Sequence, residues 1–261
     1  MGFASLGSGS RGNGTIVWVG NTLVLVDCGF TLKQTEARLA RLGLSAGDLD
    51  AILVSHEHTD HISGVAPLAH KYAIPVHASY GTLKKAREIS GAVPFDGDSG
   101  FVVGDVSINP VRVPHDSREP TQFVLESGGQ RIGVLSDLGC VTQHVVEQFS
   151  GCDYLLLEAN HDRTMLFNGS YPHRLKQRVG ANHGHLSNEQ SCTLLGNIAH
   201  ENLHVVIGHV SEQNNCSGLL QSVFAPLEST VSTLQFATQA NGFDWIGERP
   251  LSRQISFDQV L

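Results

Sequence analysis

Residues 51–61 read AILVSHEHTDH, an apolar run that leads directly into three histidines and an aspartate. The continuous apolar run at its start is typical of a strand that is buried on both faces. Residues i and i+2 share a face in an extended segment, so His56 and His58 can hold one metal ion. A tight turn after them would bring Asp60 and His61 toward a second ion. This segment therefore predicts paired metal ligands at the end of a buried strand.

Three later apolar segments also end in residues that bind metals. VSINPVRVP runs into His115, RIGVLS into Asp137, and HVVIG into His209. Ligands that follow neighbouring strands of an α/β sheet converge on one crevice. Nitrogen and carboxylate donors without thiolates suit Zn²⁺, Mn²⁺ or Fe, and spacing does not choose among them. An aspartate between two ions, here Asp137, can bridge them.

The rest of the chain alternates between strand and helix patterns without a linker. Gly20-Asn21 and Gly128-Gly129 are hairpin signals, and Ser187 with Gln190 has the spacing of a capping box. We therefore predict one α/β domain over residues 1–261, with helices covering sheets. Strands are predicted at 15–19, 22–27, 51–55, 75–79, 106–113, 121–127, 131–137, 154–159 and 204–208, and helices at 32–42, 64–72, from Ser187 onward and near 217–224.

Composition narrows the class of protein. The net charge of −8 argues against a broad, non-specific nucleic-acid binder, although it is compatible with a local basic groove. Five cysteines without CxxC spacing are typical of free thiols in a reducing compartment. The start of the chain has no apolar segment of the signal-peptide type. A cytoplasmic protein is expected, and its oligomeric state is open.

The residues quoted so far resemble one enzyme superfamily. HEHTDH at 56–61 matches the HxHxDH motif of the metallo-β-lactamase superfamily, and the later single ligands match its remaining motifs in order. The resemblance implies an αββα sandwich and two divalent metal ions. It also implies that Asp27, at the end of TLVLVD, orients the ligand loop from behind. The implied ligands are His56, His58 and His115 for the first ion, Asp60, His61 and His209 for the second, and Asp137 as the bridge.

A narrower resemblance is carried by SGSRGNGT, PHDS, SDLG, LLLEANHD, GHLSN and HVSEQNN. These segments are similar to the YycJ/VicX subgroup, whose members are regarded as DNA exonucleases or as metal-dependent hydrolases. That subgroup typically has HLS where this chain has His209-Val210-Ser211, a mild departure. The resemblance implies metal-assisted hydrolysis of a phosphodiester bond, with a nucleic acid as the expected substrate.

Candidate residues for catalysis and substrate binding lie around the predicted ligands. Asp60 is a candidate catalytic residue as well as a ligand, and His185 is a candidate to contact the phosphate or to protonate the leaving group. Residues 161–185 hold four Lys or Arg against one acid, and such a basic strip suits phosphate contacts, although a solvated helix face at 172–180 explains it nearly as well. The predicted substrate contacts are Asn13, Asn160, His161, His185 and Arg174. Asn13 and Arg11 either line the site or only turn the chain.

Three functions compete on these observations. The first is a binuclear phosphodiesterase acting on DNA, similar to a 5′–3′ exonuclease. The second is a small-molecule hydrolase: a cyclic phosphodiesterase, lactonase, thioesterase or β-lactamase. The third, a redox or non-catalytic metal protein, is disfavoured because oxygen-reducing relatives carry HxExDH where this chain has His58. The segment between Asp137 and His209 is too short for the large inserted domain of RNA-processing relatives, which makes long structured RNA a less suitable substrate.

Overall fold

The structure is a computed structural model that describes residues 1–86, 88–89 and 91–249. In it, side chains on both faces of the central strands are buried. In β3 (Thr22–Val26), Leu23 and Leu25 join a core that includes helix residues, whereas Val24 and Val26 join a core formed between two sheets. Successive side chains of a strand point to opposite faces, so each sheet packs on helices with one face and on the other sheet with the second. Residues 87, 90 and 250–261 of the predicted domain lie outside the described residues.

The first sheet contains seven strands in the described part of the chain. Its first three neighbouring pairs are antiparallel and its last three are parallel. Val19 pairs with Thr22 across the predicted Gly20-Asn21 hairpin, which is confirmed. In spatial order the strands are β14 (Phe243–Gly247), β1 (Gly2–Gly7), β2 (Gly14–Val19), β3, β4 (Ala51–Val54), β5 (Val76–Ser79) and β6 (Val93–Phe95).

The second sheet repeats this plan with seven described strands. The pairs from β7 to β10 are antiparallel and those from β10 to β13 are parallel. Gly128 and Gly129, with φ of 58° and 82°, form the predicted turn between β9 and β10. In spatial order the strands are β13 (Thr233–Phe236), β12 (His204–Gly208), β11 (Tyr154–Glu158), β10 (Gln130–Leu135), β9 (Thr121–Ser127), β8 (Val106–Arg112) and β7 (Phe101–Val103).

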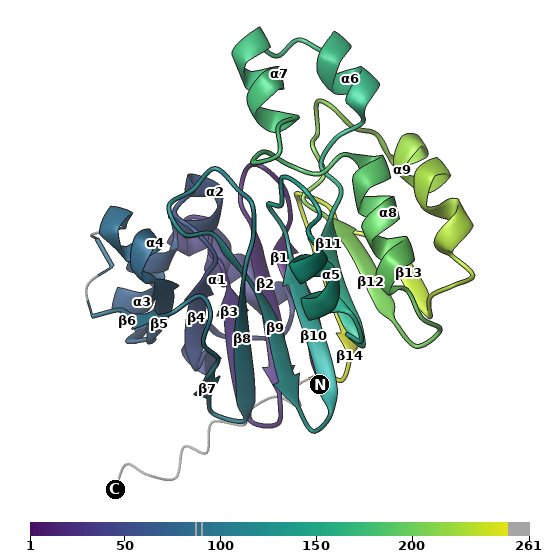
Figure 1. Ribbon diagram of the computed structural model, residues 1–261. Coiled ribbons are helices and arrows are strands. Elements are labelled where there is room, and N and C mark those ends of the chain that lie inside the picture. The colour runs from purple at the N-terminus through teal and green to yellow at the C-terminus, as the bar shows by residue number, and fades with distance from the viewer. Residues whose placement is uncertain (87, 90, 250–261) are drawn as a thin grey trace, which may run out of the picture.

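Helices cover the outer faces of both sheets (Figure 1). Apolar side chains of α1 and α3 pack on the first sheet, and those of α5, α8 and α9 pack on the second. The predicted αββα sandwich is therefore confirmed, and so is the capping box at the start of α8. No described helix is long and apolar enough to cross a membrane. The helices are α1 (Leu32–Arg41), α2 (Thr59–Ile62), α3 (Val65–Tyr72), α4 (Tyr80–Lys85), α5 (Gln143–Phe149), α6 (Arg163–Asn168), α7 (His173–Val179), α8 (Asn188–Ile198) and α9 (Ser217–Phe224), with short 3₁₀ turns η1 (Ala46–Asp48) and η2 (Ala225–Leu227).

The structure contains an amino-terminal strand that the sequence patterns did not predict. Residues 2–7 form β1, a fully buried strand between β14 and β2. Its sequence GFASLG has low intrinsic strand preference, because small side chains fit a pleated sheet poorly. A Cβ atom at Gly2 would lie 2.0 Å from the carbonyl oxygen of Glu248. The glycine therefore permits close approach of these two backbone segments. Tertiary packing, not local preference, makes this strand.

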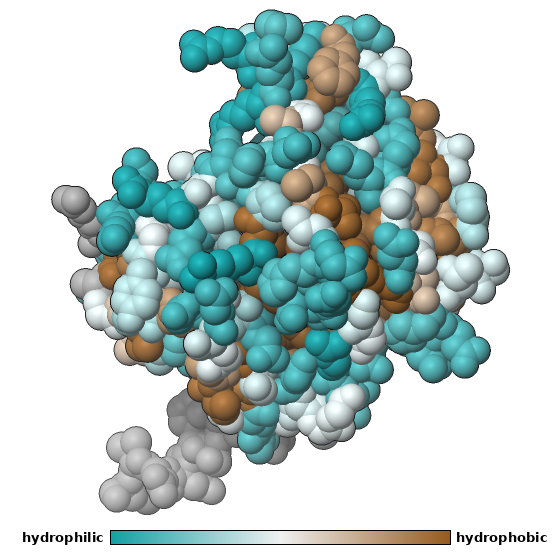
Figure 2. Space-filling model, in the orientation of Figure 1, coloured by the Kyte–Doolittle hydropathy of each residue, from teal (hydrophilic) through white to brown (hydrophobic). Residues whose placement is uncertain are grey.

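Helices α6 and α7 form an arm that projects from one end of the sandwich, at the top of Figure 1. All residues of α7 are at least partly exposed, and in α6 Leu166 is the buried residue. On the face shown in Figure 2 this arm is mostly hydrophilic, with a few apolar residues among the polar ones. The arm therefore contributes little to the three hydrophobic cores, and we refer to residues 163–179 as the α6–α7 arm.

Candidate metal centre

The predicted ligands all lie at one end of the sandwich, just after the strands that carry them. The loop after β4 carries His56 and His58, and the short helix α2 then carries Asp60 and His61. His115, Asp137 and His209 follow β8, β10 and β12 of the second sheet. The structure thus brings together seven side chains from two sheets, as the spacing predicted.

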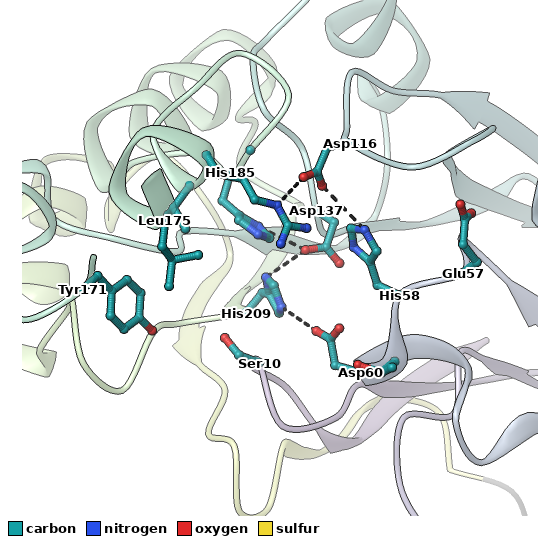
Figure 3. A pocket seen from close by; sticks show the side chains of 14 residues that line it. Ser10, Glu57, His58, Asp60, Asp116, Asp137, Tyr171, Leu175, His185 and His209 are labelled. Atoms are coloured by element: carbon teal, nitrogen blue, oxygen red, sulfur yellow. Dashed lines mark hydrogen bonds and ion pairs between the residues drawn. The ribbon is translucent and has the colours of Figure 1, made fainter. Parts of the chain in front are cut away.

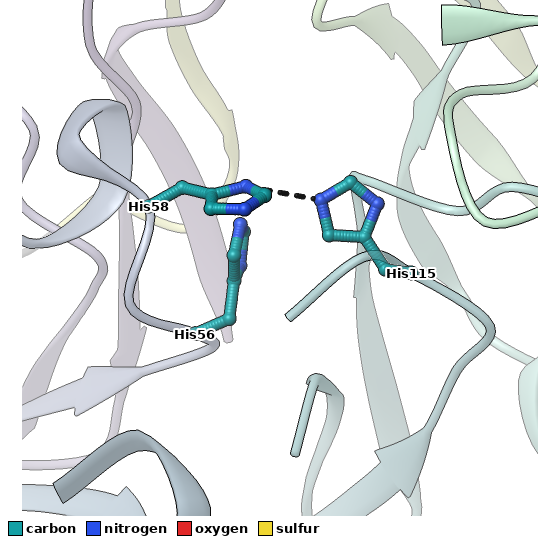
Figure 4. Close-up of side chains that lie close together, drawn as sticks. All are labelled: His56, His58 and His115. Atoms are coloured by element: carbon teal, nitrogen blue, oxygen red, sulfur yellow. Dashed lines mark hydrogen bonds between the residues drawn. The ribbon is translucent and has the colours of Figure 1, made fainter. Parts of the chain in front are cut away.

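These side chains form two groups. In the first, nitrogen atoms of His56, His58 and His115 lie within 4.8 Å of one another, and the three rings converge in Figure 4. In the second, atoms of Asp60, His61 and His209 satisfy the same distance. Each group has the size and donor chemistry of a site for one divalent ion.

Asp137 lies between the two groups. Its Oδ2 is 3.9 Å from His56 Nε2 and contacts His61 Nε2, and its Oδ1 is 3.2 Å from His209 Nδ1. Burial alone would raise the pKa of the Asp137 carboxyl, but the His209 and His61 imidazoles hold that pKa well below its ordinary value. A carboxylate that touches both groups is in the position expected of a bridging ligand.

Asp27 and Ser55 fix two of the histidines from behind. Asp27 Oδ2 accepts hydrogen bonds from His61 Nδ1 at 2.8 Å and from the Ser55 hydroxyl at 2.7 Å. Since the Ser55 proton goes to Asp27, His56 Nδ1 donates to Ser55 Oγ at 2.9 Å. Both imidazoles are thereby held with Nε2 directed to the cluster. The contacts of Asp27 support the orienting role that the resemblance implies.

Two further histidines are fixed in the same way by the second sheet and its loops. His115 Nδ1 donates to the Gly184 carbonyl at 2.9 Å, and His209 Nδ1 donates to Glu158 Oε1 at 2.8 Å. Among the buried side-chain atoms of the described residues, Nε2 of His56 and of His209 have no hydrogen-bond partner. A buried nitrogen with a free lone pair is costly unless a proton or a metal ion meets it.

Glu158 is a residue of the candidate site that the sequence interpretation missed. It is fully buried at the end of β11, and its Oε1 accepts from His185 Nδ1 at 2.7 Å and from His209 Nδ1 at 2.8 Å. Its Oε2 accepts from the backbone N–H groups of Leu138 and Leu186. Burial opposes its ionisation, yet His185 and His209 lower its pKa to about 2. The available signal was an acid closing the apolar run YLLLE, where a charge without partners would be expensive.

His185 lies beside this carboxylate, at the wall of a cavity. Its Nδ1 is 2.7 Å from Glu158 and 3.1 Å from Asp137 Oδ1. Burial would lower the pKa of His185, but Glu158 and Asp137 raise it well above its ordinary value. The predicted position of His185 next to the metal ligands is supported by these contacts.

The other predicted substrate contacts lie behind or beside the centre. Asn13 donates from Nδ2 to Asp60 Oδ2 at 3.2 Å, and Asn160 donates to the backbone carbonyl of His209 at 3.0 Å. His161 is 2% exposed, and burial lowers its pKa to about 4. Arg174 is exposed on α7 and is not among the residues that line the cavity. Contact of these four residues with a substrate therefore stays a prediction.

Arg11, the remaining residue of the amino-terminal loop considered from sequence, faces outward. Its guanidinium pairs with Glu212 at 2.7 Å, and both side chains are largely exposed. The backbone N–H of Arg11 donates to Gln239 Oε1 at 2.7 Å. These contacts favour the interpretation in which Arg11 turns the chain.

The cavity has a volume of about 380 Å³ and opens over the ligands. One wall carries the metal-binding side chains and His185; the opposite wall is the α6–α7 arm, with Tyr171 and Leu175 (Figure 3). Asp116 connects the two walls. Its Oδ1 is 3.6 Å from His58 Nε2, and its Oδ2 accepts a hydrogen bond from Arg178 of the arm.

Strained backbone is concentrated at the centre. Asp27, Asp137 and His209 have φ of 62°, 48° and 52°, and Ala73 is the fourth non-glycine residue with positive φ in the described chain. Such conformations cost of order 1–3 kcal/mol each and persist where the surroundings determine them. Each of the three follows a strand and turns its side chain into the cluster.

The donor set suits divalent metal ions. Burial would lower the pKa of His209, but Asp137, Asp60 and Glu158 raise it to about 9, and neighbouring carboxylates also raise the pKa of His61, so this part of the cluster favours positive charge. The Nε2 atom of His56, which has no hydrogen-bond partner, and the two compact donor groups agree with this electrostatic preference. The residues present therefore fit a pair of cations.

Comparisons with known proteins identify the family. The family model described as "Beta-lactamase superfamily domain" matches residues 22–208. The chain is 34% identical to exodeoxyribonuclease YycJ of Bacillus anthracis, over 83% of this chain and 85% of that protein. It is 32% identical to exodeoxyribonuclease WalJ of Streptococcus pneumoniae, over 83% and 84%.

Solved structures agree on the fold. The metallo-beta-lactamase fold protein YhfI of Bacillus subtilis superimposes with a TM-score of 0.72 at 17% identity, covering 94% of this chain and 99% of that one. At this identity the likeness concerns the fold alone. Together with the family match and the two relatives, it shows that the chain belongs to the beta-lactamase superfamily, in the subgroup of the YycJ and WalJ proteins.

Proposed function

We propose that this chain is a binuclear metal-dependent phosphodiesterase that acts on DNA as an exonuclease of the 5′–3′ type. The observation that carries the proposal is a pair of His/Asp groups meeting at Asp137 beneath an open cavity. The likeness to two proteins named exodeoxyribonucleases, over most of each chain, supports the choice of substrate. A cytoplasmic location stays a prediction.

The proposed ion sites use the seven side chains described above. His56, His58 and His115 would hold one ion, Asp60, His61 and His209 the other, and Asp137 would contact both. We favour Zn²⁺ or Mn²⁺, with Fe as a further candidate, because the donors are nitrogen and carboxylate. Two such ions supply a nucleophile from water at neutral pH and neutralise charge on the phosphate.

The chain's own residues then position the substrate and move protons. His185 borders the cavity, and Glu158 holds its Nδ1, so Nε2 is the atom available to the phosphate or to the leaving oxygen. Glu158 also orients His209, which couples the proposed proton donor to a proposed metal ligand. Asp60, proposed both as ligand and as catalytic residue, is kept in place by Asn13.

A small phosphodiester is the second candidate substrate. A cavity of about 380 Å³ has the size of a small-molecule site, and the net charge of −8 does not favour long-range attraction of a polyanion. Cyclic phosphodiesters, and less directly lactones and thioesters, therefore remain alternatives.

Hydrolysis assays with two classes of substrate separate these candidates. We would incubate the protein with Mn²⁺ or Zn²⁺ and either bis(p-nitrophenyl) phosphate or DNA, single-stranded and duplex, labelled at the 5′ or 3′ end. Metal-dependent release of mononucleotides supports the exonuclease, and the labelled end that disappears first gives its polarity. Hydrolysis of the small diester with DNA left intact indicates the second candidate. Failure to cleave either substrate contradicts the phosphodiesterase proposal.

A further inference from the structure

Four side chains of the α6–α7 arm line the cavity: Tyr171, Leu175, Arg178 and Val179. Leu175, Arg178 and Val179 share one face of α7 through their spacing of i, i+3 and i+4, and Tyr171 lies just before this helix. Such a stripe usually fills a protein core, but every residue of α7 is at least partly exposed. The stripe is thus directed at the cavity and not at the interior.

The cavity consequently has a charged end and an apolar end. The charged end holds the metal-binding groups and His185, and Asp116 links it to Arg178. Among the described residues that line the cavity, Arg178 is the only lysine or arginine. Beyond Arg178 the wall is formed by Leu175 and Tyr171, and the hydroxyl end of the Tyr171 side chain points toward Ser10 in Figure 3. A matching ligand is anionic at one end and flat and apolar at the other.

We propose that Tyr171, backed by Leu175, is a stacking surface for the base of the nucleotide whose phosphate lies at the metal centre. This inference rests on the proposed phosphodiesterase function and specifies how the terminal nucleotide is bound. A base adjacent to the scissile phosphate reaches the apolar wall when the phosphate contacts the charged end. Stacking on an aromatic ring accepts any of the four bases, as a DNA-degrading enzyme requires.

Removal of the base and removal of the ring should have the same consequence. We would measure kcat/KM on DNA with a normal terminal nucleotide and on DNA whose terminal nucleotide is abasic. The wild-type protein should lose about 10-fold on the abasic end, within the range of base–aromatic stacking. Tyr171→Ala should lose about as much on normal DNA and should no longer distinguish the two ends. Tyr171→Phe should retain the discrimination, since the ring remains.

Phe167→Ala is the matched control. Phe167 is another aromatic residue of the arm, is 56% exposed, and does not line the cavity. Its substitution should leave both rates and the discrimination at wild-type values. The inference is overturned if Tyr171→Ala discriminates as strongly as the wild type, or if the wild type does not discriminate while cleaving DNA.

A binding measurement separates this inference from the proposed function. Calorimetry on the protein loaded with Zn²⁺ or Mn²⁺ would compare deoxyadenosine 5′-monophosphate with deoxyribose 5-phosphate. We expect tighter binding of the nucleotide by wild-type protein and by Tyr171→Phe, and a loss of that preference in Tyr171→Ala. If DNA is not cleaved but the preference is found, the proposed function fails and the stacking surface stands. Equal binding of the two ligands by wild-type protein overturns the stacking surface.

Discussion

The metal centre and the α6–α7 arm face each other across one cavity but are built differently. Four of the five ligand histidines have Nδ1 fixed by a hydrogen bond to Ser55, Asp27, a carbonyl or Glu158. The arm faces them with side chains that are only partly covered, and α7 adds none to the core. Side chains held in fixed positions suit catalysis, because a catalytic reaction tolerates little displacement of the reacting groups. Residues on an exposed wall can be substituted with little loss of stability. Under the proposed function, we expect one wall to carry catalysis and the other to carry recognition.

The largest effect is expected from substitutions on the metal-binding wall. His58→Ala or Asp60→Ala should lower kcat/KM by at least about 100-fold, because a bound ion supplies several kcal/mol of transition-state stabilisation. Bound metal, measured by elemental analysis, should fall in parallel. His70→Ala, an exposed histidine of α3, is the matched control and should keep both values. Full activity in Asp60→Ala would remove this residue from the centre.

A smaller but substantial effect is expected behind that wall. Glu158→Gln should lower metal affinity or activity by about 10- to 100-fold, since a glutamine lacks the negative charge and has one acceptor oxygen, whereas both oxygens of Glu158 accept two N–H groups each. Glu158→Ala should lower it further and also reduce the melting temperature, because it leaves buried donors unpaired.

Glu189→Gln gives the matched control for this pair, since Glu189 is exposed in the first turn of α8. Metal titrations monitored by calorimetry would compare the three variants with the wild type. Wild-type metal affinity in Glu158→Gln would show that the carboxylate is not needed to orient His209.

Intermediate effects are expected on the arm, where two arginines can be compared. Arg178→Ala should raise KM by about 10-fold, because it removes the cation that lines the cavity and its bond to Asp116. Arg174→Ala, one turn earlier on α7, should have a smaller effect. Steady-state kinetics on labelled DNA would measure both. A larger effect of Arg174→Ala would reverse the assignment and favour the contact predicted from sequence.

The last prediction concerns the wild-type protein and needs no substitution. Hydrogen exchange followed by mass spectrometry should show the amides of α7 exchanging much faster than those of β11, which is a buried central strand. Equal protection of the two segments would mean that the arm is as firmly held as the sandwich, and would weaken the contrast drawn above.

Local sequence patterns predicted most of the fold and the ligands. HEHTDH holds four ligands within six residues, so a short-range pattern was sufficient to identify them. The hairpins, the capping box of α8 and the buried strands also depend on neighbouring residues, and the structure confirms them. In contrast, β1 depends on β14, more than 230 residues away, and its own residues do not favour a strand.

The missed parts of the site depend on tertiary contacts. Glu158 contacts His185 and His209, which are 27 and 51 positions away, and its own segment gives only a buried acid as a signal. On the arm, the basic composition indicated phosphate contacts but not which arginine faces the cavity. Helical spacing decides it: Arg178 shares a face of α7 with Leu175 and Val179, whereas Arg174 lies at the flank of that face.

The division of the ligands between two sheets has a consequence for folding. The histidines after β4 belong to the first sheet, and the ligands after β8, β10 and β12 belong to the second, so neither sheet alone completes the centre. The two halves of the centre meet only when the sheets dock, and β14 must return from the end of the described chain to β1. Ion uptake is then expected to be a late step of assembly, and bound ions would act as a cross-link between the sheets that opposes their separation.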